Sequence, residues 1–248
     1  MNGGDRLGGA RHSRVGESFA SASASPKILR DLALHATMDT SIQIAGKLTI
    51  ADWLAWKEKM KRASGEEMLW EQAFEFYEKR LHTRYIHPIE VIERISKNQG
   101  EGFAICSVLC SLVEALESFY QGKTYRRATK ESPLNEKTEY YKSQPIFESF
   151  LTNREPFKKY FPHPELASAF YENFRCPILH EAATRNGWIV GVSTKELLEM
   201  ISGQITVNRR ILFVFIKEFM QSYKKELLNS KELQLAFIRK MDAICETA

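Results

Sequence analysis

Residues 102–120 (GFAICSVLCSLVEALESFY) constrain the fold more than any other stretch of this sequence. The segment is long enough for about five helical turns. Its only polar stripe at helical spacing consists of Ser107, Ser111, Glu114 and Ser118. A helix that is apolar on nearly all other sides has to be enclosed by neighbouring elements. The segment therefore predicts a central helix with further helices packed around it.

Two carboxylates lie in the second half of this helix, where they need compensation. Glu114 and Glu117 are about one turn apart. The carbonyl end of a helix disfavours negative charge, and a carboxylate that is removed from water requires partners. We therefore expect groups from elsewhere in the chain to compensate both side chains.

Helical periodicity and helix-end signals continue along most of the chain. Thr49 with Asp52, and Ser193 with Glu196, match the capping pattern that opens a helix. His87 and Pro88 are expected to break the chain between two helices. The expected helical segments are 49–62, 66–81, 89–96, 102–120, 145–161, 163–174, 206–228 and 230–244. Residues 188–192 are expected to form a brief strand or an extended connection after a tight turn at Asn186 and Gly187. The predicted fold class is all-α, a helical bundle with at most a minor β element.

The same patterns divide the chain into three regions. Residues 1–47 begin with a segment of Gly, Ser, Ala and Arg that has little periodicity, and they are expected to form a mostly disordered tail. Residues 48–98 are expected to supply extra N-terminal helices that pack on the bundle. Residues 99–248 are expected to form the main helical domain.

Composition bounds the class of protein. The chain has 248 residues, of which 44% are hydrophobic, and a formal net charge of +4. The hydrophobic fraction is ample for a packed core. The small basic excess permits contact with nucleic acid without requiring it. No uninterrupted apolar run reaches the ~18 residues of a membrane span, so we expect no membrane partner.

The four cysteines indicate reduced thiols and a cytoplasmic location. They are Cys106, Cys110, Cys176 and Cys245, and no two of them form a CxxC pair. Cys106 and Cys110 lie one helical turn apart, as two metal ligands could, but buried thiols are the favoured reading. We expect neither a metal nor a cofactor.

The stretch FRCPILHEAATRNGW, residues 174–188, places Arg175 and His180 on either side of Pro177. Residues five apart on a straight helix are separated by about 140°, so the two side chains would not share a face. A kink at Pro177 could aim both into one cleft. The alternative is a core histidine bonded to a backbone carbonyl, with the arginine paired to Glu172 or Glu181.

An Arg, four intervening residues and a His near the end of a helical bundle resemble the signature of the HEPN superfamily. The resemblance extends over roughly residues 90–245, through the apolar helix with Glu114 and Glu117, the basic loop after Gly122 and the two closing helices. It implies a HEPN-like bundle that dimerises, so that Arg175 and His180 of two chains line a shared cleft.

In active members of that superfamily the cleft cuts RNA without a metal. Carried over, the resemblance implies that His180 acts as general acid or base for attack by a ribose 2′-hydroxyl, and that Arg175 stabilises the phosphate. In several members an acidic or polar side chain from the neighbouring helix orients this pair, and the resemblance assigns that role to Glu114 first and to Glu117 second. Asn173 and Glu181 are further supporting candidates.

Three function hypotheses follow. The first is a metal-independent endoribonuclease of HEPN type with a defence or toxin role, whose partners are RNA, a second copy of the chain and an antitoxin or regulatory protein. The second is a catalytically inactive HEPN-like dimer that binds a nucleotide, RNA or protein in the same cleft. The third is a helical interaction protein in which Arg175 and His180 only satisfy Glu114 and Glu117.

Overall fold

Helix α5 (Glu101–Gln121) is the centre of the fold, as its apolar sequence predicts. The computed structural model describes residues 39–62, 67–97 and 99–248. Within this part of the chain, α5 packs against α6 (Ser143–Asn153), α9 (Arg209–Asn229) and α10 (Lys231–Glu246). By length and composition α5 could cross a membrane, but 56% of its most apolar window is buried inside the fold. That burial is the pattern of a core helix.

The N-terminal helices are α2 (Ile50–Arg62), α3 (Glu67–Leu81) and α4 (His87–Ile95). The expected cap of α2 is confirmed, because the backbone N–H of Thr49 donates to Asp52 at 2.7 Å. The expected break at His87 and Pro88 is wrong. A π-helical turn, η1 (His82–Ile86), instead joins α3 directly to α4. The wider turn lets the helix pass a proline in the first turn of α4 without a gap.

An aromatic cluster fixes α2 and α3 to α10. The rings of Trp53 and Trp56 stack with centroids 4.6 Å apart, and Trp53 also lies near Phe237 of α10. The indole N–H of Trp53 donates to Asp242 of α10 at 2.8 Å. Residues 39–248 consequently form one compact unit.

The N-terminal boundary of the ordered fold lies earlier than predicted. Strand β1 (Gln43–Ala45) pairs antiparallel with β2 (Leu48–Thr49), and Ile44 and Ala45 are buried. This hairpin includes residues 43–47 of the segment 1–47, which was expected to be mostly disordered. The first 38 residues of that segment lie outside the part of the chain that the structure describes.

A three-stranded sheet replaces the expected start of the long C-terminal helix. Its order is β5 (Trp188–Gly191), β7 (Gln204–Asn208) and β6 (Leu198–Ile201). The positive φ angles of Ser202 and Gly203 form the hairpin turn between β6 and β7. The expected cap at Ser193 is wrong, because α9 begins only at Arg209. The fold is mainly helical, as expected, while the HEPN-like arrangement of its helices stays a prediction.

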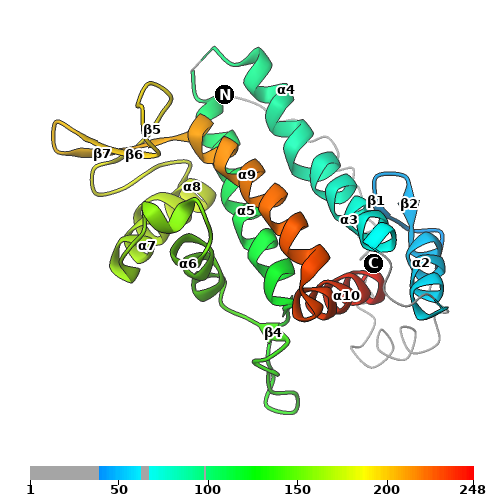
Figure 1. Cartoon of the computed structure of the whole chain (residues 1–248). Coiled ribbons are helices and arrows are strands. Elements are labelled where there is room, and N and C mark those ends of the chain that lie inside the picture. Colours follow the sequence, from blue (N-terminus) through cyan, green and yellow to red (C-terminus); the bar gives the residue numbers. More distant parts are fainter. Residues whose placement is uncertain (1–38, 63–66, 98) are drawn as a thin grey trace, which may run out of the picture. The chain divides into compact units, whose positions relative to one another are not determined.

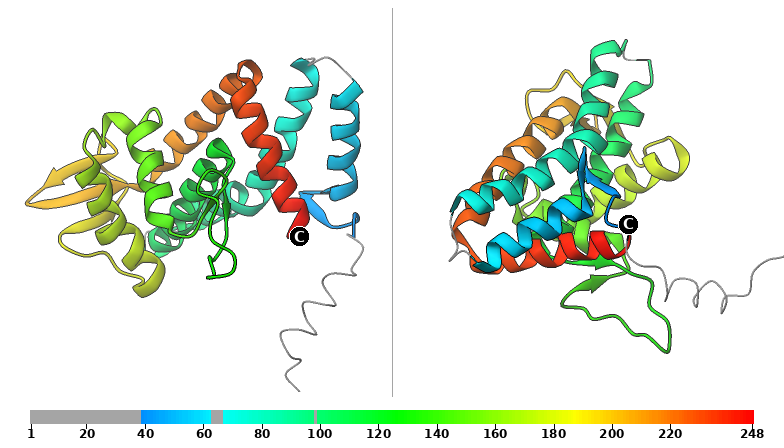
Figure 2. Two further views of the ribbon diagram at one scale, coloured as in Figure 1. Left: turned by 90° about the horizontal axis from the view of Figure 1, so that it is seen from below. Right: turned by 90° about the vertical axis from the view of Figure 1, so that its right-hand side faces the viewer.

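The basic loop expected over residues 121–145 contains the short parallel pair β3 (Thr124–Tyr125) and β4 (Glu139–Tyr140). Figures 1 and 2 show this segment extending away from the helices. Arg126 binds Glu139 at 2.6 Å, so one of the loop's cations is used to hold the loop together.

The N-terminus of α9 gives a direct stability test. The side chain of Asn208 is 2% exposed, accepts from the backbone N–H groups of Arg210 and Ile211, and donates to the carbonyl of Thr194 at 2.8 Å. We expect Asn208→Ala to lower the free energy of unfolding by about 2 kcal/mol, because it removes a cap and leaves a carbonyl without a partner. Ser230→Ala, which removes the single-bond cap of α10, should cost about half as much. Urea denaturation of both variants checks this, and equal losses would contradict it.

Candidate functional site

Arg175 lies at a change of helix type. Helix α7 (Pro164–Phe170) continues into a π-helical turn, η3 (Tyr171–Arg175), and then into α8 (Cys176–Glu181). Pro177 has no N–H to offer to the carbonyl of Asn173, four residues earlier. That carbonyl accepts from the backbone N–H of Arg185 at 2.9 Å instead. At the site of the kink expected near Pro177, the structure has a π-helical turn, and the chain stays helical through it.

The structure brings Arg175 together with Glu114 of α5, which is 61 residues away in the sequence. Nη2 of Arg175 lies 3.2 Å from Oε2 of Glu114, and the hydroxyl of Tyr140 donates to Oε1 of the same carboxylate at 3.1 Å. The guanidinium also lies over the ring of Tyr171, 5.0 Å from its centroid. Glu114 thus has a cation on one oxygen and a neutral donor on the other.

Burial keeps the donors of this cluster protonated. Removal from water raises the pKa of Tyr140 well above its ordinary value, and the negative charge of Glu114 raises it further. Burial likewise raises the pKa of Tyr171, while the nearby charge of Arg175 opposes the shift. Tyr140 therefore acts as a hydrogen-bond donor to Glu114 at all physiological pH values.

Arg175 and His180 have different environments. Arg175 is 9% exposed, and its Nε is buried without a hydrogen-bond partner among the described residues. His180 is exposed near the end of α8, which terminates where Ala182 adopts a left-handed conformation. Within the described chain, no side chain hydrogen-bonds to the ring of His180. The π-helical turn thus anchors the arginine in the fold, while the histidine faces solvent.

The supporting candidates Asn173 and Glu181 stabilise the turn that follows α8. Asn173 donates to the carbonyl of Ala169 at 2.9 Å and accepts from the side chain of Asn186 at 2.7 Å. Glu181 forms an ion pair with Arg185. These contacts fix the loop between α8 and β5, and neither residue has a described contact with Arg175.

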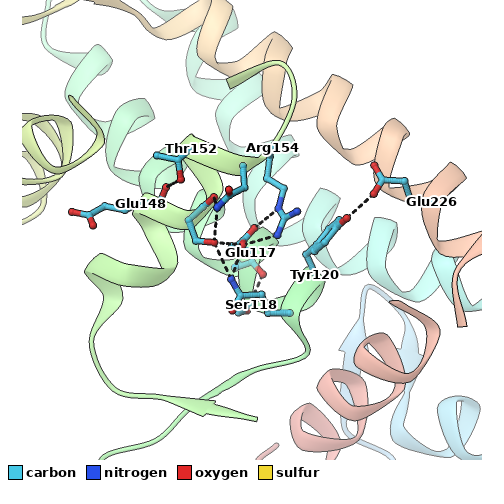
Figure 3. Close-up of polar contacts among 11 residues, drawn as sticks. Glu117, Ser118, Tyr120, Glu148, Thr152, Arg154 and Glu226 are labelled. Atoms are coloured by element: carbon cyan, nitrogen blue, oxygen red, sulfur yellow. Dashed lines mark hydrogen bonds and ion pairs between the residues drawn. The ribbon is translucent and has the colours of Figure 1, made fainter. Parts of the chain in front are cut away.

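Glu117 has a partner other than the predicted one. It is fully buried and binds the guanidinium of Arg154 through both oxygens, at 2.8 and 2.9 Å (Figure 3). Ser149 and Gln121 donate to the same carboxylate at 2.7 and 2.6 Å. The expectation that Glu117 orients Arg175 is therefore wrong, whereas the expected compensation of both helix carboxylates is confirmed.

The cysteines of α5 are buried thiols. Cys106 and Cys110 have no disulfide partner, and burial raises the pKa of Cys110 to about 12. Across residues 39–62, 67–97 and 99–248, no three His, Cys, Asp or Glu side chains gather as a metal site would require.

A cavity of about 330 Å³ lies beside Glu114, the candidate that pairs with Arg175. Sequence reasoning did not find its three cations, Arg80 and Arg84 of the α3–η1 segment and Lys240 of α10. The i,i+4 spacing of Arg80 and Arg84 near the end of a helix was the available signal. Lys240 had none, because only the packing of α10 brings it near them.

Comparison of the chain with protein-family models, with curated proteins and with solved structures finds no match in any of the three. Membership of the HEPN superfamily accordingly stays a prediction based on Arg175, His180 and Glu114.

Proposed function

We propose that the chain is a metal-independent endoribonuclease of HEPN type, which cleaves single-stranded RNA at a cleft shared by two copies of the chain. The observation that carries the proposal is the contact of Arg175 with Glu114 at 3.2 Å. In several members of the superfamily an acidic or polar side chain from the neighbouring helix orients this pair, and we assign that role to Glu114 on α5. His180, exposed on the next helical turn, is free to meet a substrate.

The proposed reaction needs two imidazoles, a neutral one on one copy and a protonated one on the other, and a guanidinium. Neutral His180 accepts the proton of a ribose 2′-hydroxyl, and the 2′-oxygen then attacks the adjacent phosphorus. The bond from phosphorus to the 5′-oxygen breaks, which gives a 2′,3′-cyclic phosphate, and the histidine of the second copy protonates the leaving oxygen. Arg175 stabilises the charge that develops on the phosphate oxygens, and Glu114 holds the guanidinium in place.

We assign the activity to the cytoplasm on the basis of the unpaired cysteines, and to a defence or toxin system by the same resemblance. An antitoxin or another regulatory partner would hold such an enzyme in check. In this proposal the second copy of the chain is part of the active site. The proposal therefore requires that the protein sediments as a dimer.

The test is incubation of the protein with end-labelled single-stranded RNA in excess EDTA. We expect cleavage that leaves a 2′,3′-cyclic phosphate, and we expect His180→Ala to slow it at least ~100-fold, because proton transfer by a positioned side chain contributes about 10²- to 10⁴-fold. The substitution removes an exposed side chain, so circular dichroism should show an unchanged fold.

His163→Ala is the matched control, since His163 is also exposed but precedes α7, away from the motif. Its cleavage rate should equal that of the unmodified protein. Cleavage that survives in His180→Ala, or that stops on addition of EDTA, would contradict the proposal.

The inactive binding module is the second candidate, and the environment of His180 favours it. None of the described residues hydrogen-bonds to the imidazole, so nothing within one chain fixes its orientation, while Arg175 is mostly buried. RNA that is bound but left intact in the same assay is the result that distinguishes this candidate from the first.

A further inference from the structure

The cavity beside Glu114 is lined mainly by cationic and hydroxyl groups. Arg80, Arg84, Ser111, Tyr140 and Lys240 lie in its wall together with Glu114, and its volume is about 330 Å³. They come from four separate elements: the α3–η1 segment, α5, β4 and α10. The cavity is therefore formed by the fold, and no single helix face accounts for it.

The one carboxylate in this wall is already compensated. Arg175 and Tyr140 each bind one oxygen of Glu114, at 3.2 and 3.1 Å. The three cations that line the cavity therefore share one carboxylate, which Arg175 already pairs. Such an arrangement attracts anions into a concave site.

The cations have donors to spare. Nη1 of Arg80 donates to the carbonyl of Ile44 at 2.7 Å, and Nζ of Lys240 donates to the carbonyl of Lys123 at 2.9 Å. These contacts anchor both side chains and leave further N–H groups on each. Arg84 is exposed and has no hydrogen bond or ion pair with any described residue. Two fixed cations and one free one thus border the same space.

Burial and mutual repulsion make this grouping costly without an anion. Burial and, to a smaller extent, the charge of Arg80 lower the pKa of Lys240 to about 8, while Glu114 opposes the shift. Burial also lowers the pKa of Arg80 to about 10, with Arg84 acting in the same direction. A bound anion would offset both effects.

We propose that this cavity binds the phosphoryl group of a small phosphorylated ligand through Arg80, Arg84 and Lys240. Guanidinium groups present paired donors to phosphate oxygens, and lysine adds a point charge. The volume is at the lower end of the range for small-molecule sites. Three cations around one such space suit a single phosphoryl or pyrophosphoryl group better than the spaced phosphates of a polymer. The site does not depend on the proposed ribonuclease activity.

Isothermal titration calorimetry of the full chain with inorganic pyrophosphate at pH 7 tests the proposal. We expect saturable binding, and we expect Arg84→Gln to weaken it about tenfold, because a charge-assisted contact to phosphate is lost. Arg94→Gln is the matched control: Arg94 is exposed on α4, in the same continuous helical segment and outside the cavity, and the change in net charge is identical. Its affinity should stay within about twofold of that of the unmodified protein.

No saturable binding by the unmodified protein, or equal weakening by Arg84→Gln and Arg94→Gln, would overturn the proposal. Competition identifies the source of the phosphoryl group. If a short single-stranded RNA without terminal phosphates displaces pyrophosphate, the cavity is an RNA contact and the small-ligand proposal is wrong. His180→Ala should bind pyrophosphate normally, so this site and the proposed ribonuclease can fail independently.

Discussion

Glu117→Ala will lower the free energy of unfolding by about 4 kcal/mol, because removal of one partner from a buried ion pair leaves the other without compensation. The side chain of Glu117 is fully buried, and that of Arg154 is 17% exposed. In the variant the guanidinium of Arg154 would stay against the ring of Tyr120, 3.5 Å from its centroid, without its counter-ion. The side chains of Ser149 and Gln121, which donate to the carboxylate of Glu117, would lose their acceptor as well.

Urea denaturation at pH 7 measures the loss, and two further variants locate its cause. Glu58→Ala removes an exposed partner of Lys61, 2.6 Å away on α2, and should change stability by less than about 0.5 kcal/mol. The double variant Glu117→Leu with Arg154→Met should be more stable than Glu117→Ala alone, since no charge is then buried without a partner. A cost below ~1 kcal/mol for Glu117→Ala would show that the buried pair does not hold α6 against α5.

The helix carboxylates illustrate how far the sequence predicts the site. The dipole argument required partners for Glu114 and Glu117, and both have one. The motif also pointed to the contact between Glu114 and Arg175. The motif could not identify Arg154 as the partner of Glu117, because this pairing depends on how α6 and the turn after it pack across α5. Helical spacing describes the faces of one helix and contains no information on which neighbour covers each face.

The missed hairpin has a different cause. Residues 198–208 read LEMISGQITVN, in which a Ser-Gly turn separates two short runs with strand character. The second run leads directly into the apolar residues of α9, and together they resemble one long helical segment. Asn208 marks the true boundary, since its side chain caps the first turn of α9. An asparagine near the start of the expected helix was the signal available in the sequence, since asparagine is a common N-cap residue.

Gly122→Ala will lower the free energy of unfolding by about 3 to 4 kcal/mol, the sum of backbone strain and a steric conflict that the neighbouring helix cannot relieve cheaply. Gly122 ends α5 with a φ of +63°, a left-handed conformation that favours glycine. A Cβ at this position would lie 2.6 Å from both Cα and the carbonyl oxygen of Ala236 in α10, and 2.5 Å from Nη2 of Arg239. The Arg239 side chain can move, but the backbone of α10 can yield only if the whole helix shifts.

Three comparison variants separate strain from steric conflict in thermal or urea denaturation. Gly203→Ala changes a glycine with a φ of +79° and no atom within 4 Å of the new Cβ, so it should cost only the strain, about 1 kcal/mol. Asparagine tolerates the left-handed conformation better than alanine does, so Gly203→Asn should be nearly neutral. Gly122→Asn should stay strongly destabilised, because its Cβ meets the same backbone. If asparagine restores stability at Gly122, then strain alone explains the loss, and α10 does not pack against the end of α5 as closely as the structure places it. A displaced α10 would also move Lys240 and Asp242, so the anion-binding cavity and the anchor of Trp53 both depend on this close approach.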